Sequence, residues 1–560
     1  MSQLRSADRS RRLLLLRGLA DRSPDDLTGP LPSAVEAWDL LERAERADQE
    51  ALERVLVHPY TGSWEGYTTR LIEHGLTGEC PIWVHYGYFH TLAAAAAIHA
   101  GLDCTIRVPV WNDTVVLPTL GAAQLDEGGG FTTAVVRVEA GTFTISGGRS
   151  QVISGATGWS ALRDFRLEAG KRVLELRLDD LDPHRGLYHP IPPDRLAEAD
   201  VKAWRELLGE AWELIVKHLP EYAEVLPMGL TSIVPAPAVR FRLPSASTGE
   251  AFGSATIATP DEPATLAAAL IHEFQHIRLS ALLELVPLHD DDHTERLYAP
   301  WREDPRPLGG LVQGVYAFFG VSAFWRALSR ARPGDRLAAF EFAHWRAQAW
   351  ETLEVVRDDV ALTEEGRRFL TNLAAVFGPW QNEPVTPEAL HWTTTLAADH
   401  RAGWRLRHIR PEMATVARLV RARLAGAPCP PVGPEGKLDT VSDGEWPNAR
   451  ADLVRVRLGS DGEARLSRIW SKVPDALEGD YRLIAGRTDD ARTAYQADLE
   501  TNPEHASALI GLSLSLPPGP ATRALLEVPE LVRAVHRELR RVGTAPSFDE
   551  LAGWIGEALP

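Results

Sequence analysis

The 560-residue sequence contains little cysteine: Cys80, Cys104 and Cys429 are its only three, and they form no CxxC pair. We therefore expect neither a disulfide framework nor a thiolate metal cage. Basic residues are also few, because 59 Lys and Arg face 77 Asp and Glu and give a formal net charge of −18. Nucleic acids and anionic membranes select concentrated positive charge, so neither is an expected partner.

Long hydrophobic runs are missing as well. The longest apolar runs near the amino terminus are LLLL at 13–16 and LAAAAAI at 92–98. Both are too short for a signal-peptide core or a membrane span. Together with the low cysteine content, this predicts a cytoplasmic protein without a membrane segment.

The first third of the chain changes from helical to extended patterning. Apolar spacing in residues 1–102 predicts helices at 34–56, 65–76 and 87–101. Residues 103–192 contain short runs of Val, Ile and Thr separated by Gly, Asp and Asn. They predict antiparallel strands, with hairpin turns at WNDT and EAGT.

The remaining chain is predominantly helical. Residues 193–426 are expected to form a helical catalytic domain, and a Pro/Gly-rich linker follows at 427–436. Residues 437–560 predict a C-terminal helical domain. The predicted fold class is therefore α+β and mainly helical, with a β-rich region between helical ones.

The C-terminal region contains one segment, within 480–515, that resembles a single tetratricopeptide-type helical hairpin. Its marker residues are Ala491, Ala494, Tyr495, Asn502 and Pro503. Such hairpins need neighbours to bury their faces, so this tail is also a candidate surface for a protein partner.

The sequence IHEFQH places His272, Glu273 and His276 within a predicted helix at 264–286. Residues four apart project from one helix face, so the two imidazoles can bind a single metal ion. Two hydrogen-bonded core histidines are the alternative. The flanking sequence is apolar nearly all round, and a buried helix rarely tolerates three titratable groups without an ion or a polar network.

The third metal ligand remains open. Peptidases with HExxHxxGxxH need Gly and His where this chain has Leu279 and Leu282, which excludes that class. Glu284 and the His and Asp/Glu side chains of the loop 289–295 are possible ligands. Gln313 is the single amide in GGLVQGVYAFFGVSAFW, and its carbonyl can either bind the metal or support a ligand histidine.

At the level of several motifs, the sequence resembles the bacterial HExxH-motif proteins encoded near peptide natural-product clusters, described as 2-oxoglutarate- and iron-dependent peptide β-hydroxylases. The resemblance covers roughly residues 36–420. The segments that carry it are VLVHPYTGSWEGY (55–67), the alanine-rich helix with IRVPVW and VLPTLG (92–121), RFRLPSAS (240–247), LIHEFQHIRLSALLELVPL (270–288), YAPWREDPRPLGGLVQGVYAF (298–318) and WRLRHIRPE (404–412).

This resemblance implies Fe(II) bound by His272 and His276, with 2-oxoglutarate as cosubstrate and O₂ as oxidant. It further implies that the substrate is a ribosomally synthesised precursor peptide, hydroxylated at a side-chain β-carbon. Two imidazoles and one further protein ligand leave positions for the oxoacid and O₂. Imidazole binds zinc as well as iron, so the motif alone does not choose the metal.

A dicarboxylate cosubstrate also requires a cation, and arginine can hold a carboxylate with two parallel hydrogen bonds. The candidates are Arg302 and Arg306 in PWREDPRP, and Arg240 and Arg242 in a predicted strand before the HExxH helix. For each of them, an internal salt bridge is the alternative role.

Glu273 distinguishes the competing functions. In a zinc metallopeptidase acting on a precursor peptide it would be the general base that deprotonates metal-bound water. An oxygenase needs no such base, and there Glu273 can orient a histidine or hold the peptide. A non-catalytic peptide-binding protein with an unused motif is the third possibility.

Overall fold

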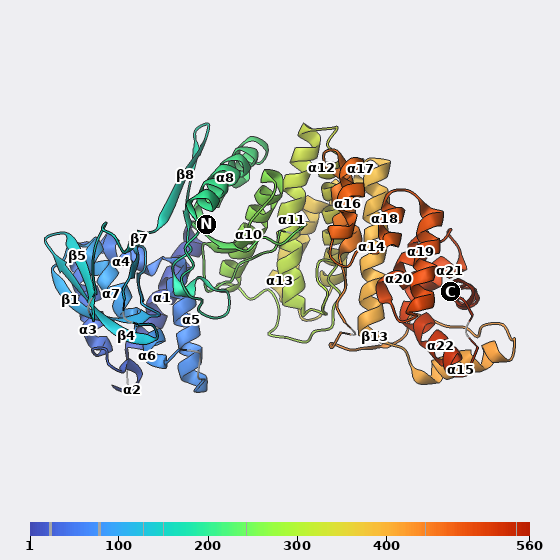
Figure 1. Ribbon diagram of the computed structural model, residues 1–560, viewed down its shortest axis with the longest axis horizontal. Coiled ribbons are helices and arrows are strands. Elements are labelled where there is room, and N and C mark those ends of the chain that lie inside the picture. Colours follow the sequence, from blue (N-terminus) through green and yellow to red (C-terminus); the bar gives the residue numbers. More distant parts are fainter. Residues whose placement is uncertain are drawn as a thin grey trace. The chain divides into compact units, whose positions relative to one another are not determined.

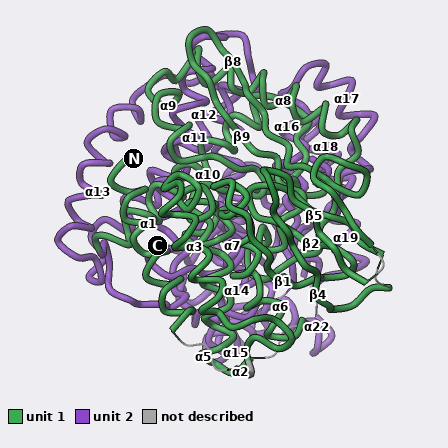
Figure 2. The backbone as a smooth tube through the Cα atoms, turned by 90° about the vertical axis from the view of Figure 1, so that its left-hand side faces the viewer, with its two compact units in different colours: residues 1–239, 243–286 green, residues 240–242, 287–560 purple. Residues whose placement is uncertain are grey.

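The computed structural model describes residues 1–21, 25–76, 80–126, 128–148, 150–241, 243–442, 444–544 and 546–560. The chain has the predicted mixed α+β fold, about 57% helical, and in chain order the two large sheets follow the first seven helices and precede the helical second half (Figure 1). It divides into two compact units: residues 1–239 with 243–286 form unit 1, and residues 240–242 with 287–560 form unit 2 (Figure 2). This division falls inside the region 193–426 that the sequence predicts as one domain.

Unit 1 begins with seven helices. They are α1 (Ser2–Asp21), α2 (Asp25–Thr28), α3 (Ala34–Ala47), α4 (Gln49–Leu56), α5 (Pro59–His74), α6 (Ile82–Tyr86) and α7 (Tyr88–His99). The prediction of one continuous helix at 34–56 is wrong, because Asp48 has extended backbone angles (φ −151°, ψ 107°). Its side chain accepts a hydrogen bond from the Glu50 N–H, so Asp48 ends α3 and caps α4.

A seven-stranded antiparallel sheet follows. Its strands are β1 (Cys104–Trp111), β2 (Thr114–Leu117), β3 (Gly121–Gln124), β4 (Phe131–Glu139), β5 (Thr142–Gly147), β6 (Ser150–Ile153) and β7 (Trp159–Ala161), in the order β6-β5-β4-β1-β2-β3-β7. Both predicted hairpin turns are confirmed. Asn112 and Asp113 in one turn, and Ala140 and Gly141 in the other, have positive φ, as a two-residue type I′ turn requires.

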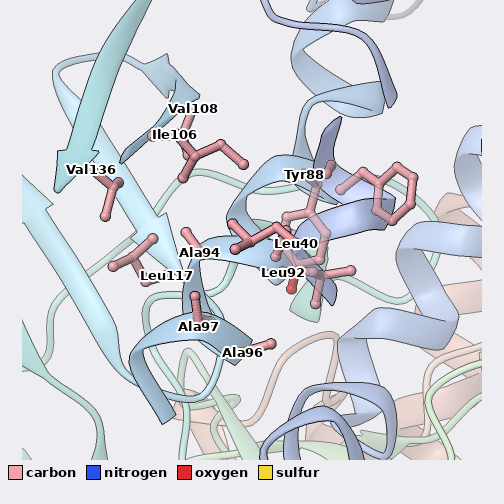
Figure 3. Packing of buried hydrophobic residues seen from close by; sticks show 14 of the residues in the cluster. Leu40, Tyr88, Leu92, Ala94, Ala96, Ala97, Ile106, Val108, Leu117 and Val136 are labelled. Carbon is pink, nitrogen blue, oxygen red and sulfur yellow. The ribbon is translucent and has the colours of Figure 1, made fainter. Parts of the chain in front are cut away.

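Helix α7 packs on this sheet through its alanines (Figure 3). Residues 93–97 are all alanine and fully buried. Their small side chains allow the helix backbone to come close to Val108 and Val136 of the sheet, while Leu40 and Leu92 fill the space towards α3. The alanine-rich run is therefore a core helix, as its shortness predicts.

The second sheet has five strands: β8 (Arg163–Ala169), β9 (Arg172–Leu178), β10 (Ser232–Ala236), β11 (Ser245–Ala246) and β12 (Ser254–Ala258), ordered β11-β12-β10-β9-β8. β10 runs parallel to both of its neighbours, and the other pairs are antiparallel. The helical elements of this part are η1 (Pro183–Arg185), α8 (Glu198–His218), α9 (Pro220–Val225), η2 (Leu226–Met228) and α10 (Pro263–Leu283). α8 packs against both β8 and α10.

Unit 2 is almost entirely helical. Its elements are α11 (Leu308–Ala331), α12 (Arg336–Val356), α13 (Glu364–Phe377), η3 (Gly378–Asn382), α14 (Pro387–His408), β13 (Ile409–Arg410), α15 (Met413–Leu424), β14 (Lys437–Leu438), α16 (Ala449–Leu458), α17 (Gly462–Ile469), η4 (Trp470–Lys472), α18 (Glu478–Ile484), α19 (Thr488–Thr501), α20 (Ala506–Ser515), α21 (Pro520–Glu527), α22 (Pro529–Arg541) and α23 (Phe548–Gly556). Helix α14 ends at His408. Pro411 disfavours the helical conformation in Arg410, the residue before it, so the helix could not continue through this segment.

The predicted helical hairpin in the tail is present as α19 and α20, which pack on each other. Ala491 and Tyr495 are fully buried, and the Tyr495 ring lies against Gly479 and Gly511, where no larger side chain would fit. Helices α14, α18 and α21 also contact the hairpin. These neighbours supply the burial that an isolated hairpin would lack.

By length and composition, one helix of the described chain, α11, could cross a membrane. Of its most apolar window, 61% is buried inside the protein. Core helices of soluble proteins pass the same test, so this helix is weak evidence for a membrane segment.

Candidate metal centre

Helix α10 carries the HExxH sequence through the core of unit 1. It begins with Pro263 in its first turn and ends at Leu283, close to the predicted range 264–286. Its buried residues lie on all sides, as the even apolar pattern predicts. The polar side chains of the motif are therefore placed by a rigid element.

His272 and His276 point toward each other from neighbouring turns of α10. Their Nε2 atoms are 3.1 Å apart, and the ring centroids lie 4.7 Å apart with the planes nearly perpendicular. Without an ion, one ring can donate its Nε2 proton to the other. The geometry therefore meets the first condition of a shared metal ion, namely that both nitrogens face one point.

The distance between the two nitrogens also suits one shared ion, and His272 is in the protonation state that metal binding needs. Two nitrogens that each lie about 2.1 Å from one ion span roughly 3 Å when they take neighbouring coordination positions. The surrounding protein, and secondarily the charge of His276, lowers the pKa of His272 well below its usual 6.5. His272 is therefore neutral at physiological pH, which is the form that binds metals.

Glu273 has two serine partners from the RFRLPSAS segment. Ser245 donates a 2.6 Å hydrogen bond to Oε1, and Ser247 donates a 2.6 Å hydrogen bond to Oε2. The serines are two residues apart on an extended chain at β11, so both hydroxyls face the same side and match the two carboxylate oxygens. We call this arrangement the serine clamp.

The serine clamp holds a fully buried carboxyl group. Burial raises the pKa of Glu273 above its usual 4.5, although the charge of His276 and the two hydroxyls favour the ionised form. Sequence reasoning identified Glu273 but not Ser245 or Ser247. The spacing of two serines in a predicted extended segment was the signal that could have revealed them.

The third ligand is not identified by the described residues, among which no group of three or more His, Cys, Asp or Glu could hold a metal. Gln313 lies on α11 in unit 2, and its role as a metal ligand stays a prediction. Glu284 follows α10 in unit 1 and lies 3.7 Å from Arg11. In the loop of unit 2, His293 is exposed and pairs with Asp291.

The candidate cosubstrate arginines of the PWREDPRP segment share one acid. Arg302 Nε donates to Asp304 Oδ1 at 3.0 Å, and Arg306 Nη1 donates to Asp304 Oδ2 at 3.0 Å. Burial opposes ionisation of Asp304, but the two arginines lower its pKa overall. The internal salt bridge is thus present for both, and each guanidinium still has further N–H donors.

Arg240 does not lie in a strand, so that part of the prediction is wrong. It occupies an exposed turn between β10 and β11, where Phe241 has a φ of 68°. Its guanidinium lies 5.9 Å from the centre of the Phe241 ring. Arg242 is outside the described residues.

Two motifs that are far apart in sequence meet in unit 2. Tyr298 and His400 Nδ1 share a 2.7 Å hydrogen bond, and the Glu303 carbonyl accepts from Arg407 and lies 2.8 Å from His408 Nε2. The end of α14 therefore fixes the loop that carries Arg302. His400 was missed, although His400, Trp404 and His408 follow one helix face at a spacing of four residues.

Comparison with protein-family models and with curated proteins finds no match. The candidate centre is therefore argued from its own residues.

Proposed function

We propose that this protein is a cytoplasmic Fe(II)- and 2-oxoglutarate-dependent oxygenase that hydroxylates the β-carbon of a residue in a ribosomally synthesised peptide. The observation that carries the proposal is the convergence of His272 Nε2 and His276 Nε2, 3.1 Å apart, on a buried helix. A non-catalytic protein has no need to direct two imidazole nitrogens at one point in this way.

The donor set suits iron. Two imidazoles with one further protein ligand leave room for a bidentate oxoacid and for O₂, and a bound Fe(II) would supply the oxidative chemistry. We propose His272 and His276 as ligands, with Gln313 as the third. The N–H donors that Arg302 and Arg306 do not give to Asp304 are the proposed partners of the cosubstrate carboxylate.

The serine clamp favours an oxygenase over a metallopeptidase. A general base must keep an oxygen directed at metal-bound water. Both oxygens of Glu273 instead accept hydrogen bonds from the hydroxyl groups of Ser245 and Ser247. Glu273 therefore acts as a positioning residue that ties β11 to α10 beside the histidines.

The test starts from protein purified without oxygen and loaded with Fe(II) or with Zn(II). The cognate precursor peptide, 2-oxoglutarate and O₂ are then added, and peptide mass and succinate are measured. We expect the peptide to gain one oxygen atom in the iron sample, with one succinate formed per oxygen gained.

The matched variants are His272→Ala, which should abolish the reaction, and Glu273→Gln, which should retain much of it. Peptide cleavage in the zinc sample, lost in Glu273→Gln, would instead establish a metallopeptidase. An unchanged peptide with both metals would leave only the non-catalytic function.

A further inference from the structure

Unit 1 contains a second polar site, a cavity of about 850 Å³ that none of the HExxH residues lines. It lies between one face of α1 and the β8–β9 hairpin, with His58 and Ser232 among its lining residues. This volume is in the upper part of the range of about 300–1,000 Å³ that is typical of small-ligand sites. We call it the α1 cavity.

The sheet side of the α1 cavity is charged but internally paired. Asp164 and Arg166 on β8 lie opposite Arg177 and Glu175 on β9, and alternate strand residues share a face. Arg177 donates to Asp164 at 2.9 Å, and Arg166 donates to Glu175 at 2.8 Å. Each acid on this side therefore already has its arginine.

The helix side leaves a positive surplus. Arg9 of α1 donates to Glu53 at 2.6 Å, and Asp8 pairs with the buried Arg12 at 2.9 Å. Arg5 also lines the cavity and forms no ion pair within the described chain. In a protein with a net charge of −18, a cavity whose unmatched groups are basic departs from the average surface.

His58 adds a buried donor or acceptor at the base of the cavity. Its side chain is almost fully buried, and its Nε2 lies 3.5 Å from Asp182 Oδ2. Asp182 is also buried and accepts hydrogen bonds from the Tyr88 hydroxyl at 2.7 Å and the His184 N–H at 2.8 Å. Nε2 is therefore the ring nitrogen on the Asp182 side, and Nδ1 is the nitrogen that is left for a ligand.

We propose that the α1 cavity binds a carboxylate-bearing segment of the peptide substrate, with Arg5 at the rim and His58 at the base. Arginine binds carboxylates through its planar fork, and the His58 ring supplies a second polar contact in the same cavity. This proposal rests on the proposed peptide substrate. It assigns to unit 1 a recognition site separate from the candidate metal centre.

Direct binding tests this site without metal or turnover. A short fluorescein-labelled peptide of repeating Glu-Gly-Ser, and its Gln-Gly-Ser counterpart, are titrated with the full chain in EDTA, and anisotropy is recorded. We expect the acidic peptide to bind about tenfold more tightly, since a charged hydrogen-bonding partner contributes about that factor. Arg5→Glu and His58→Gln should each remove most of this preference.

Arg46→Glu is the matched control, because Arg46 is an exposed arginine of α3 that does not line the cavity. It changes the net charge equally and should keep the preference. Because His58 is buried, the His58→Gln result counts only if the circular dichroism spectrum of that variant is native. If it is not, Arg5→Glu decides alone. Equal binding of both peptides, or equal losses in Arg5→Glu and Arg46→Glu, would overturn the proposal.

Two further arms separate the possible causes of failure. If free 2-oxoglutarate displaces the acidic peptide and Arg5→Glu weakens both, the cavity holds a small dianion and the peptide assignment is wrong. If the cognate peptide is hydroxylated equally well by Arg5→Glu at limiting peptide concentration, the proposed function stands and the cavity assignment fails. Acidic-peptide binding in the His272→Ala variant supports the cavity even where hydroxylation is never observed.

Discussion

Unit 1 and unit 2 both bury charged side chains, but they do so differently. In unit 2, Arg450 donates to Asp399 at 2.8 Å and to Asp480 at 2.5 Å, and Tyr495 donates to Asp480 at 2.6 Å. All four side chains are almost fully buried. The single cation lies between the two acids, and these hydrogen bonds all form within the protein. We call this group the Arg450 network.

In unit 1, the polar groups of α10 are arranged differently. The serine clamp satisfies Glu273, whereas His272 and His276 direct two nitrogens at a common point. A group that is complete within the protein serves stability, whereas donors that converge on one point are expected where a ligand is bound. The difference between the two units is thus a physical criterion for function that does not depend on resemblance to a known protein family.

The largest effect is expected from Arg450→Met. This variant leaves Asp399 and Asp480 buried without their cation, which should lower the free energy of unfolding by about 3–5 kcal/mol. Urea unfolding of the metal-free protein measures it. Arg492→Met, at a more exposed pair with Asp489, is the control and should change stability by less than about 1 kcal/mol. Similar losses in the two variants would show that the Arg450 network is not a stability element.

The reverse pattern is expected for His272→Ala. Metal affinity should fall by more than about a hundredfold, since loss of a mere supporting partner costs about 10–100-fold. Metal-free stability should change little, because no charge is left unpaired. Titration with Fe(II) or Co(II) followed by absorption spectroscopy measures the affinity. His391→Ala, at an exposed position of α14, is the control. Equal affinity in wild type and His272→Ala would remove the candidate centre.

An intermediate effect is expected when both serines of the clamp are replaced by alanine. Glu273 then loses both hydroxyl donors, and the metal affinity should fall by about tenfold through the misplacement of α10 relative to β11. Ser467→Ala, in an exposed position of unit 2, controls for the loss of a hydroxyl. An unchanged affinity, with native circular dichroism, would show that the clamp has no part in the site.

The smallest direct effect, within about 1 kcal/mol at pH 5, is expected for Glu65→Gln. Glu65 is fully buried, and neither carboxylate oxygen has a hydrogen-bond partner among the described residues. Burial raises its pKa well above the usual 4.5, although Arg12 favours the ionised form. A raised pKa contributes stability below 4.5 that is lost as the pH rises toward the folded-state value.

Wild type should therefore lose more stability than Glu65→Gln between pH 5 and pH 8. Urea unfolding at several pH values, in EDTA, records the difference. If the free energy of unfolding changes equally with pH in the two proteins, the pKa of Glu65 is not raised by burial as the structure indicates.

The fold class, most elements and the helix of the candidate site could be predicted from local patterns. Helical spacing placed α10 within three residues at either end, and turn sequences placed both hairpins. The errors arose where one residue decides the backbone, as at Asp48, whose cap divides a periodic run. Periodicity reports an average over several turns and is insensitive to such a break.

The partners of the predicted residues were harder to predict. Ser245 and Ser247 are 28 and 26 residues from Glu273, and nothing in local periodicity links them. The same holds for Tyr298 and His400, which are 102 residues apart. Such pairings are set by tertiary packing, so a sequence identifies which side chains need partners but not which side chains provide them.

The serine clamp has a consequence for how the protein would acquire the metal that we propose. Glu273 is anchored by two serine hydroxyls of its own chain, so this contact between β11 and α10 needs no ion to form. Zinc fingers, by contrast, fold only as they bind. Here the ion would bind beside a contact that forms without it. Occupancy of the site should therefore follow the metal supply in the cell, while the fold persists through cycles of metal binding and release.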